Sequence, residues 1–346
     1  MSQVHYIIGI GRSGTSLLMS ILGSHREILT PPENYFSVFF YHAYAKKTYF
    51  SPHDIQLIQR FNEAFHRLQP PVGFEYDIPH TLLERGFEGT YSALCENIYS
   101  CYRQVAFPDK KHNYIIDKNP SNTLFLKSIQ KLRPEAKYIL MVRDYRANIL
   151  SRKESVHLLP PSVMFNAIRW SLFTKLALRF KEKYPDRVQI LRYEDLINAP
   201  EEQLETVFQF LGIKPDTSED LKEQERSAYL EYKSDSQTSD SARAQKKYED
   251  LAKPIFKDRV EKWKESLTSA EIELADYICH REASTCGYLP ETIHQKIPLS
   301  TKFILLTTRF KVLFSYLKDQ LTYYLPISFK VKRFERFVNK VRHNRN

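Results

Sequence analysis

Short apolar runs and helical patterns alternate along the first two thirds of the chain. Residues 4–10 form an apolar run that predicts a buried strand, and residues 17–22 predict an apolar helix directly after it. Further strands are predicted at 28–30, 114–116, 137–142 and 188–193, and further helices at 54–68, 90–107, 121–133, 160–183 and 201–211. This alternation is typical of an α/β fold with a central parallel sheet and helices on both faces.

Two segments depart from the alternation. Residues 36–110 predict a helical insertion, rich in Tyr and Phe at 36–50, with a loop at 77–89. Those aromatic side chains fit either the lining of an acceptor cleft or helix–helix core packing. A last core helix is predicted at 268–283, capped by Thr268 or Ser269. We therefore expect one domain over residues 1–290 and a helical extension over 291–346.

The loop after the first strand has the spacing of a phosphate-binding loop. Gly9 and Gly14 have the separation of G-x-x-x-x-G-K-[ST], and Ser16 stands at the Ser/Thr position. Free backbone N–H groups at the start of the next helix favour an anion. Thr15, however, occupies the lysine position, and the cation is Arg12, inside the loop. The change disfavours triphosphate hydrolysis but leaves other phosphate-bearing nucleotides open, as well as a plain turn without a ligand.

A second segment supplies another cation and hydroxyl. Arg143 stands at the end of the predicted strand 137–142, and Ser151 follows two turns into a helix. Because both lie near the carboxyl edge of the sheet, they could converge on one phosphate.

Together these two segments resemble the motifs of sulfotransferases that use 3′-phosphoadenosine 5′-phosphosulfate (PAPS). The family's loop [KR]-S-G-T-[ST] corresponds to residues 12–16, and its R-D-P-R-x-x-x-x-S motif corresponds to residues 143–151, with Tyr145 in place of proline. The resemblance covers about residues 4–290 and implies a P-loop NTPase-like sulfotransferase fold. It also implies PAPS as cofactor, 3′,5′-ADP as product, a hydroxyl-bearing acceptor and no metal.

The resemblance also implies roles for single residues. Glu33 has the spacing of the glutamate base of the protein-tyrosine type, and Lys118 matches the lysine of K-[TD]-x-P. Asn119 replaces the histidine of the cytosolic type, which favours Glu33 as base, with Arg12 and Lys118 stabilising charge on the sulfonate. The implied cofactor contacts are Gly11, Arg12, Ser13, Gly14, Thr15, Ser16, Arg143, Ser151, Tyr193 near the adenine, Lys253 and Arg259.

The cysteines and the apolar runs of the sequence indicate the cellular compartment that we expect. Cys95, Cys101, Cys279 and Cys286 show neither C-x-x-C spacing nor a zinc pattern, which predicts buried thiols in a reducing compartment. Neither a signal peptide nor an apolar run long enough to cross a bilayer is visible, so we expect a cytoplasmic protein.

Charge is concentrated at the C-terminal end. The net charge is +10, and residues 296–346 hold 12 Lys or Arg against two acids, so residues 1–295 are neutral. In the tail Phe334, Phe337, Val338 and Val341 recur at helical spacing beside basic residues, which predicts docking on an anionic membrane surface. Packing of the stripe on the enzyme's own core or on a second subunit is an equal alternative, and nucleic acid is less favoured because the tail is so apolar.

Two rival functions remain at this stage. A kinase on a related P-loop fold conflicts with Thr15 at the lysine position. A membrane-recruited, non-catalytic nucleotide-binding protein conflicts with the presence of Glu33, Lys118 and both phosphate motifs. Whether the acceptor is a sugar, a lipid or a tyrosine, and whether the chain forms oligomers, does not follow from the sequence.

Overall fold

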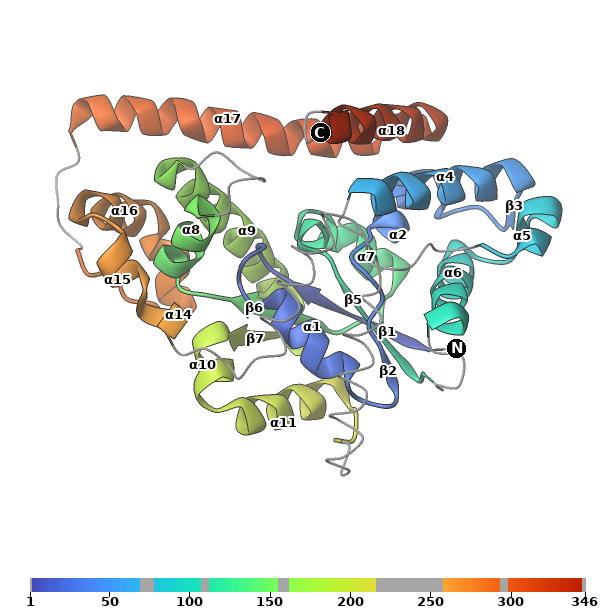
Figure 1. Cartoon of the computed structure of the whole chain (residues 1–346), viewed down its shortest axis with the longest axis horizontal. Helices are drawn as coiled ribbons and strands as arrows, with labels where there is room; N and C mark the ends of the chain where they lie inside the picture. Colours follow the sequence, from blue (N-terminus) through green and yellow to red (C-terminus); the bar gives the residue numbers. More distant parts are fainter. Residues whose placement is uncertain are drawn as a thin grey trace.

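The architecture is a five-stranded parallel sheet between helical layers (Figure 1). The computed structural model describes residues 2–68, 78–106, 112–154, 162–215, 258–292 and 298–343. The strand order is β2-β5-β1-β6-β7, and every pair is parallel. The strands are β1 (Gln3–Ile8), β2 (Ile28–Leu29), β5 (Tyr114–Lys118), β6 (Tyr138–Val142) and β7 (Val188–Arg192). This confirms the predicted α/β class.

Helices cover both faces of the sheet, and successive side chains of each strand point to opposite faces. Apolar side chains are therefore buried on both sides. Ile7 and Met141 pack on the face covered by α1 (Thr15–Gly23), α10 (Tyr193–Asn198) and α11 (Pro200–Leu211). Tyr6 and Leu140 pack on the other face, with the larger core. Its helices are α4 (Pro52–Leu68), α6 (Tyr91–Ala106), α7 (Leu126–Leu132), α8 (Tyr145–Lys153), α9 (Val163–Lys183) and α16 (Ser269–Thr285).

The strand order places the carboxyl end of β1 at a switch point. After β5 the chain crosses over β1 to form β6 on its other side. Loops that follow neighbouring strands therefore diverge at this point and leave a crevice, which is where open α/β sheets bind ligands. The glycine loop begins at this crevice.

Two sequence predictions are wrong in detail. The predicted loop at 77–89 contains α5 (His80–Arg85) and β4 (Phe87–Glu88), which pairs with β3 (Tyr49–Phe50). That pairing joins segments far apart in the chain, so the local pattern does not reveal it. The predicted single helix 121–133 is a 3₁₀ helix, η1 (Pro120–Phe125), followed by α7. Phe125, at φ −128°, interrupts the helical backbone between them.

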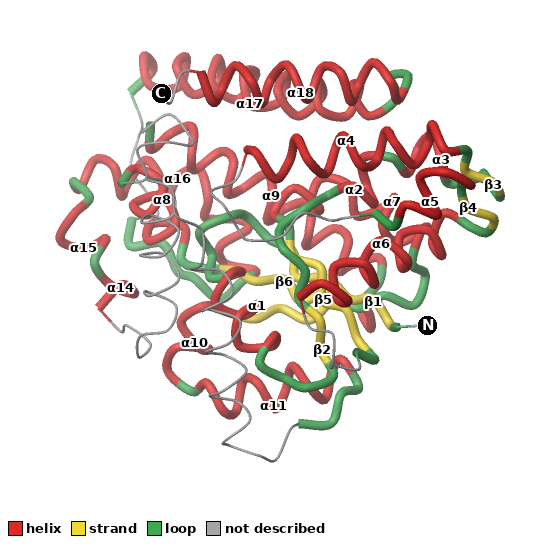
Figure 2. Tube along the Cα trace, turned by 45° about the vertical axis from the view of Figure 1, so that its right-hand side comes forward, coloured by secondary structure: helices red, strands yellow, loops and turns green. Residues whose placement is uncertain are grey.

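The C-terminal extension is helical, as predicted, and forms a layer over the rest of the molecule (Figures 1 and 2). It consists of α17 (Leu299–Tyr323), which packs on α9, and α18 (Ile327–His343), which packs on α4. Part of the predicted lipid-facing stripe turns inward: Phe334 stacks among Phe61 and Phe65, and Val338 is fully buried. Packing against the α4 aromatic cluster thus covers part of this stripe, as in the alternative of packing on the enzyme's own core, while Phe337 stays 52% exposed.

One charged group of the extension is buried where it joins the body. Lys330 is 2% exposed, and its amine donates to the backbone carbonyls of Phe39 at 2.6 Å and Tyr323 at 3.0 Å. The same amine lies over the rings of both residues. Burial lowers the pKa of Lys330 to about 8, because it penalises the charged form.

This buried lysine predicts a pH-dependent stability. Because its pKa is lower in the folded chain than the ordinary value of 10.5, the unfolded chain binds more protons between about pH 8 and 10.5. The free energy of unfolding should therefore rise with pH across this window, by up to about 3 kcal/mol, relative to a Lys330→Met variant. Urea denaturation of both proteins at several pH values measures the difference. Parallel pH profiles would contradict the assignment.

Candidate functional site

The glycine loop passes so close to the sheet that two positions have no room for a side chain. Gly9 has φ +128°, and a Cβ there would lie 2.4 Å from the Met141 carbonyl oxygen. Gly14 has φ +89°, and a Cβ there would lie 2.4 Å from the Tyr193 ring. Gly14 also precedes α1, whose first turn no side chain caps. The backbone therefore presents free N–H groups at the crevice.

Three side chains that the sequence analysis missed hold this loop in place. Thr123 of η1 accepts a hydrogen bond from the Gly9 N–H at 2.9 Å. Asn148 of α8 donates to the Gly11 carbonyl and to the buried Ser13 hydroxyl, at 3.1 and 3.0 Å. Arg152 donates to the Gly11 carbonyl at 2.9 Å. Asn148 and Arg152 lie on the same helix as Ser151, three residues before it and one residue after it. Their nearness to Ser151 is the only feature of the sequence that could have indicated a role for them.

The two predicted phosphate elements meet. The Arg12 side chain donates to the Ser151 hydroxyl at 3.0 Å, and Arg12 itself has φ +73°, a backbone conformation uncommon outside glycine. Arg143 donates to the Arg12 carbonyl at 3.4 Å and lies over the Tyr193 ring at 4.5 Å. The sequence analysis paired Ser151 with Arg143, whereas here the hydroxyl binds Arg12.

The loop is strongly electropositive. Arg152 is buried beside it, and burial, followed by repulsion from Arg169 and Arg12, lowers its pKa to about 9. Holding the buried Arg152 guanidinium near other positive charges costs free energy that a bound anion would offset. Arg12, Arg143 and Arg152 thus converge on one loop, in keeping with a site for phosphate groups.

Lys118 and Glu33 form an ion pair at the end of β5. The Lys118 side chain is 1% exposed, and its amine also donates to the Ser16 hydroxyl in the first turn of α1, at 3.1 Å. Glu33 remains 28% exposed and so is accessible from the crevice. In a nucleotide P-loop, a lysine at the position of Thr15 supplies the amine. Here the amine comes from Lys118, on the neighbouring strand β5.

Beside Lys118 lies a buried carboxyl group. Asp117 accepts hydrogen bonds from Tyr99 and Asn122, and burial raises its pKa to about 6. It faces the insertion helix α6 rather than the crevice, so its role is structural.

Packing explains why Tyr145 stands where the family motif has a proline. Tyr145 is fully buried, donates to Asp276 of α16 and packs on Trp170. Asp144 caps α8 by accepting from the Arg146 N–H at 2.8 Å. The Arg146 guanidinium lies over Trp263, which joins the second motif to the late tryptophan element. Aromatic packing therefore replaces proline at the start of this helix.

Two further predicted nucleotide contacts, Lys253 and Arg259, come late in the chain. Lys253 lies outside the described residues. Arg259 belongs to α14 (Asp258–Glu261), which packs beside α8. Within the described ranges, no group of three or more His, Cys, Asp and Glu side chains is placed to hold a metal ion.

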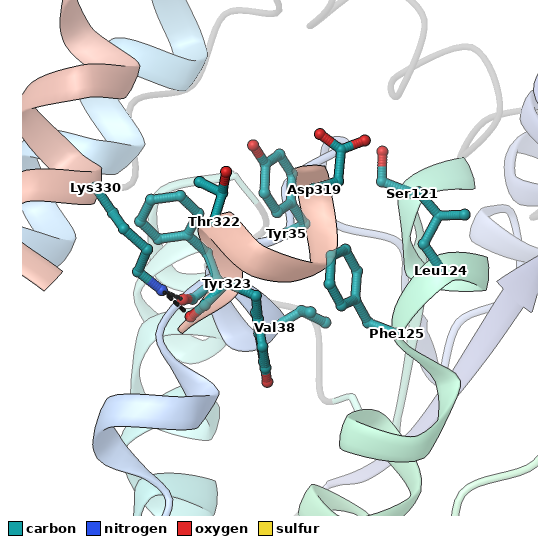
Figure 3. Close-up of a pocket in the computed structure, with 10 residues that line it drawn as sticks. Tyr35, Val38, Ser121, Leu124, Phe125, Asp319, Thr322, Tyr323 and Lys330 are labelled. Carbon is teal, nitrogen blue, oxygen red and sulfur yellow. Dashed lines mark hydrogen bonds between the residues drawn. The ribbon is translucent and has the colours of Figure 1, made fainter. Parts of the chain in front are cut away.

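A cavity of about 190 Å³ is lined by residues that follow closely after Glu33 and Lys118 in the chain (Figure 3). Tyr35, two residues after Glu33, and Ser121, three residues after Lys118, lie on its rim with Asp319. Its walls are mostly apolar, and α17 and α18 contribute Asp319, Thr322, Tyr323 and Lys330. The C-terminal layer therefore helps to shape the surroundings of the site.

Comparison with known proteins identifies the family. The model of the sulfotransferase family matches residues 6–217, which contain the loop, Glu33, Lys118, Arg143, Ser151 and Tyr193. The chain belongs to the sulfotransferase family. The sulfotransferase domain from the curacin biosynthetic pathway has the same fold, with a TM-score of 0.51 and 18% identity over 84% of this chain and 99% of that domain.

Several curated proteins are similar in sequence. A putative protein-tyrosine sulfotransferase of Caenorhabditis briggsae is 24% identical over 61% of this chain and 66% of its own length. Nodulation protein NoeE of Sinorhizobium fredii is 25% identical over 61% and 50%. The omega-hydroxy-beta-dihydromenaquinone-9 sulfotransferase Stf3 of Mycobacterium tuberculosis is 28% identical over 34% and 32%. The chain thus matches less than two thirds of the length of these relatives.

The loop geometry predicts that alanine is destabilising at Gly9 but tolerated at Gly11. Gly9→Ala should destabilise the protein by about 2–4 kcal/mol, because its Cβ would overlap a backbone carbonyl at a positive φ. Gly11→Ala is the matched control: its Cβ would meet its nearest neighbours at 3.5 and 3.6 Å, an ordinary contact distance. Thermal or urea unfolding of both variants measures the difference. Equal stabilities would show that the loop does not approach β6 in this way.

Proposed function

We propose that this sulfotransferase moves the sulfonate of PAPS to an acceptor hydroxyl. The observation that carries the proposal is the convergence of Arg12, Arg143 and Arg152 on a glycine loop, next to the Glu33–Lys118 pair. The loop N–H groups of residues 13–16 would hold the 5′-phosphate. Arg143 and Ser151 would hold the 3′-phosphate, and Tyr193 would lie near the adenine.

In the proposed reaction, the acceptor oxygen attacks sulfur in line with the departing phosphate. Glu33 takes the proton of the acceptor hydroxyl, because it is the partly exposed carboxylate of the pair. Arg12 and Lys118 stabilise the charge that develops on the sulfonate and on the leaving oxygen. Most of the rate enhancement then comes from positioning and electrostatics, as in phosphoryl transfer.

The acceptor would approach from the cavity that Tyr35 and Ser121 border. Its mostly apolar walls and polar rim suit a hydroxyl carried on an apolar group. The names of the relatives include both a tyrosine phenol and a hydroxylated menaquinone as acceptors. Lipid, tyrosine and carbohydrate hydroxyls all remain candidates.

A P-loop kinase is the rival function. The amine of Lys118 donates to the Ser16 hydroxyl, so a cation does reach the start of α1, as a kinase site requires. The positions of Arg143 and Ser151 favour PAPS instead, because ATP has no 3′-phosphate for them to bind.

Binding of the 3′-phosphate gives the first test. Calorimetry should show 3′,5′-ADP binding about 10- to 100-fold tighter than 5′-AMP, the usual contribution of a charge-assisted phosphate contact. Arg143→Ala should remove most of this preference, whereas Arg179→Ala, an exposed arginine on α9, should leave it unchanged. Equal affinity for both nucleotides in the native protein, or tighter binding of ATP with phosphate transfer, would overturn the PAPS assignment.

Removal of the proposed base gives the second test. Glu33→Gln keeps the shape but cannot accept the proton, so transfer of radiolabelled sulfate from PAPS to a cell extract should fall about 10²–10⁴-fold. Affinity for 3′,5′-ADP should stay near that of the native protein. Glu88→Gln, an exposed site on β4, is the control. Native-like turnover of the Glu33 variant would rule it out as the base.

A further inference from the structure

The outward side of α17 is an exposed apolar stripe. Of the fifteen large hydrophobic side chains exposed in the described part of the chain, twelve lie between Leu299 and Phe337. On α17 they recur every three or four residues, so they share one face: Phe303, Leu306, Phe310, Phe314, Leu317 and Leu321. Phe303, Phe314 and Leu321 are 68, 71 and 70% exposed. A continuous patch of this kind marks an interaction surface.

Packing on the enzyme does not account for this stripe. The opposite side of α17 already serves that purpose, since Leu305, Val312 and Tyr323 are buried in the main core. The helix is thus apolar on two opposite sides, and only one of them is buried in the core. At the edge of the stripe, Leu306 and Phe310 also line a pocket with residues of α9 and α16. The other side calls for a second apolar environment.

Basic residues border the stripe on both sides. Lys302 and Arg309 each precede a stripe residue by one position, and Lys311 and Lys318 each follow one, so the helix turn places them on opposite flanks. All four are exposed. On α18, in the same layer, the exposed side adds Lys332, Arg333, Arg336 and Lys340.

The two acids of the extension are directed toward the body of the protein. Glu335 forms a two-pronged ion pair with Arg60 of α4, at 2.7 and 2.9 Å. Asp319 lines the cavity on the inner side of α17 and remains exposed at its mouth. The outward surface of the described layer therefore combines mainly apolar and basic side chains.

We infer that the outward face of α17 docks the protein on an anionic lipid bilayer. The helix lies in the interface plane, with its stripe among the acyl chains and its flanking amines at the phosphates. No described helix is long and apolar enough to cross a membrane. A second copy fits this face less well, because two such surfaces would bring like charges together.

This orientation has a consequence for the acceptor. The inner side of the same helix lines the cavity through Asp319, Thr322 and Tyr323. Docking therefore places that cavity about 10 Å, one helix diameter, beneath the lipid surface.

Vesicle sedimentation with the full chain tests the inference. The native protein should sediment with phosphatidylcholine vesicles that contain phosphatidylglycerol, should bind far less to pure phosphatidylcholine, and should be released by high salt. Lys311→Gln with Lys318→Gln should weaken the partition coefficient about 20- to 30-fold. Phe310→Ser with Phe314→Ser should weaken it by at least about tenfold for each residue.

Matched variants separate docking from folding. Lys183→Gln with Lys214→Gln, and Tyr49→Ser with Leu289→Ser, change exposed residues on other surfaces and should leave sedimentation unchanged. All variants should unfold at the same temperature as the native protein and bind 3′,5′-ADP with the same affinity. If the native protein itself does not bind 3′,5′-ADP, the proposed function is wrong, and the sedimentation result still tests membrane docking. Equal sedimentation of all variants would overturn the inference. So would a native dimer that the Phe310/Phe314 variant converts to a monomer while vesicle binding stays unchanged.

Discussion

The close approach of the glycine loop to the sheet is the constraint on which the site depends. Gly9 lies against the carbonyl oxygen of β6, and Gly14 lies against the ring of Tyr193. A loop this tight directs its N–H groups toward the crevice, and it must be held there by other elements. Thr123 from η1 and the pair Asn148 and Arg152 from α8 supply those hydrogen bonds.

The same closeness concentrates positive charge. Arg12, Arg143 and Arg152 all reach one short loop, and the low pKa of Arg152 reflects its burial and its charged neighbours. The ion pair of Lys118 with Glu33 lies at the edge of this field and connects it to α1 through Ser16. Lys118 thus contacts both the glycine-loop region, proposed to bind an anion, and the Glu33 carboxylate, proposed to accept a proton.

The C-terminal layer combines two roles that seemed to be alternatives. One side of each helix completes the core: α18 adds Phe334 to the aromatic cluster of α4, and α17 adds Val312 and Tyr323. The other side leaves apolar and basic residues exposed. The inner side of α17 also lines the cavity that Tyr35 and Ser121 border.

The sequence alone determined the sheet, its helices and the phosphate-binding motifs, because these rest on local periodicity and on residues at fixed short spacing. Gly9, Gly14, Arg12 and Arg143 could all be named from it. The tertiary structure alone revealed Thr123, Asn148 and Arg152, since each acts through contacts between segments far apart in the chain. It also decided which side of each C-terminal helix is buried. Phe334 and Phe314 are alike in an apolar helical pattern, and only the position of α4 and α9 beneath the layer makes one of them core and the other surface.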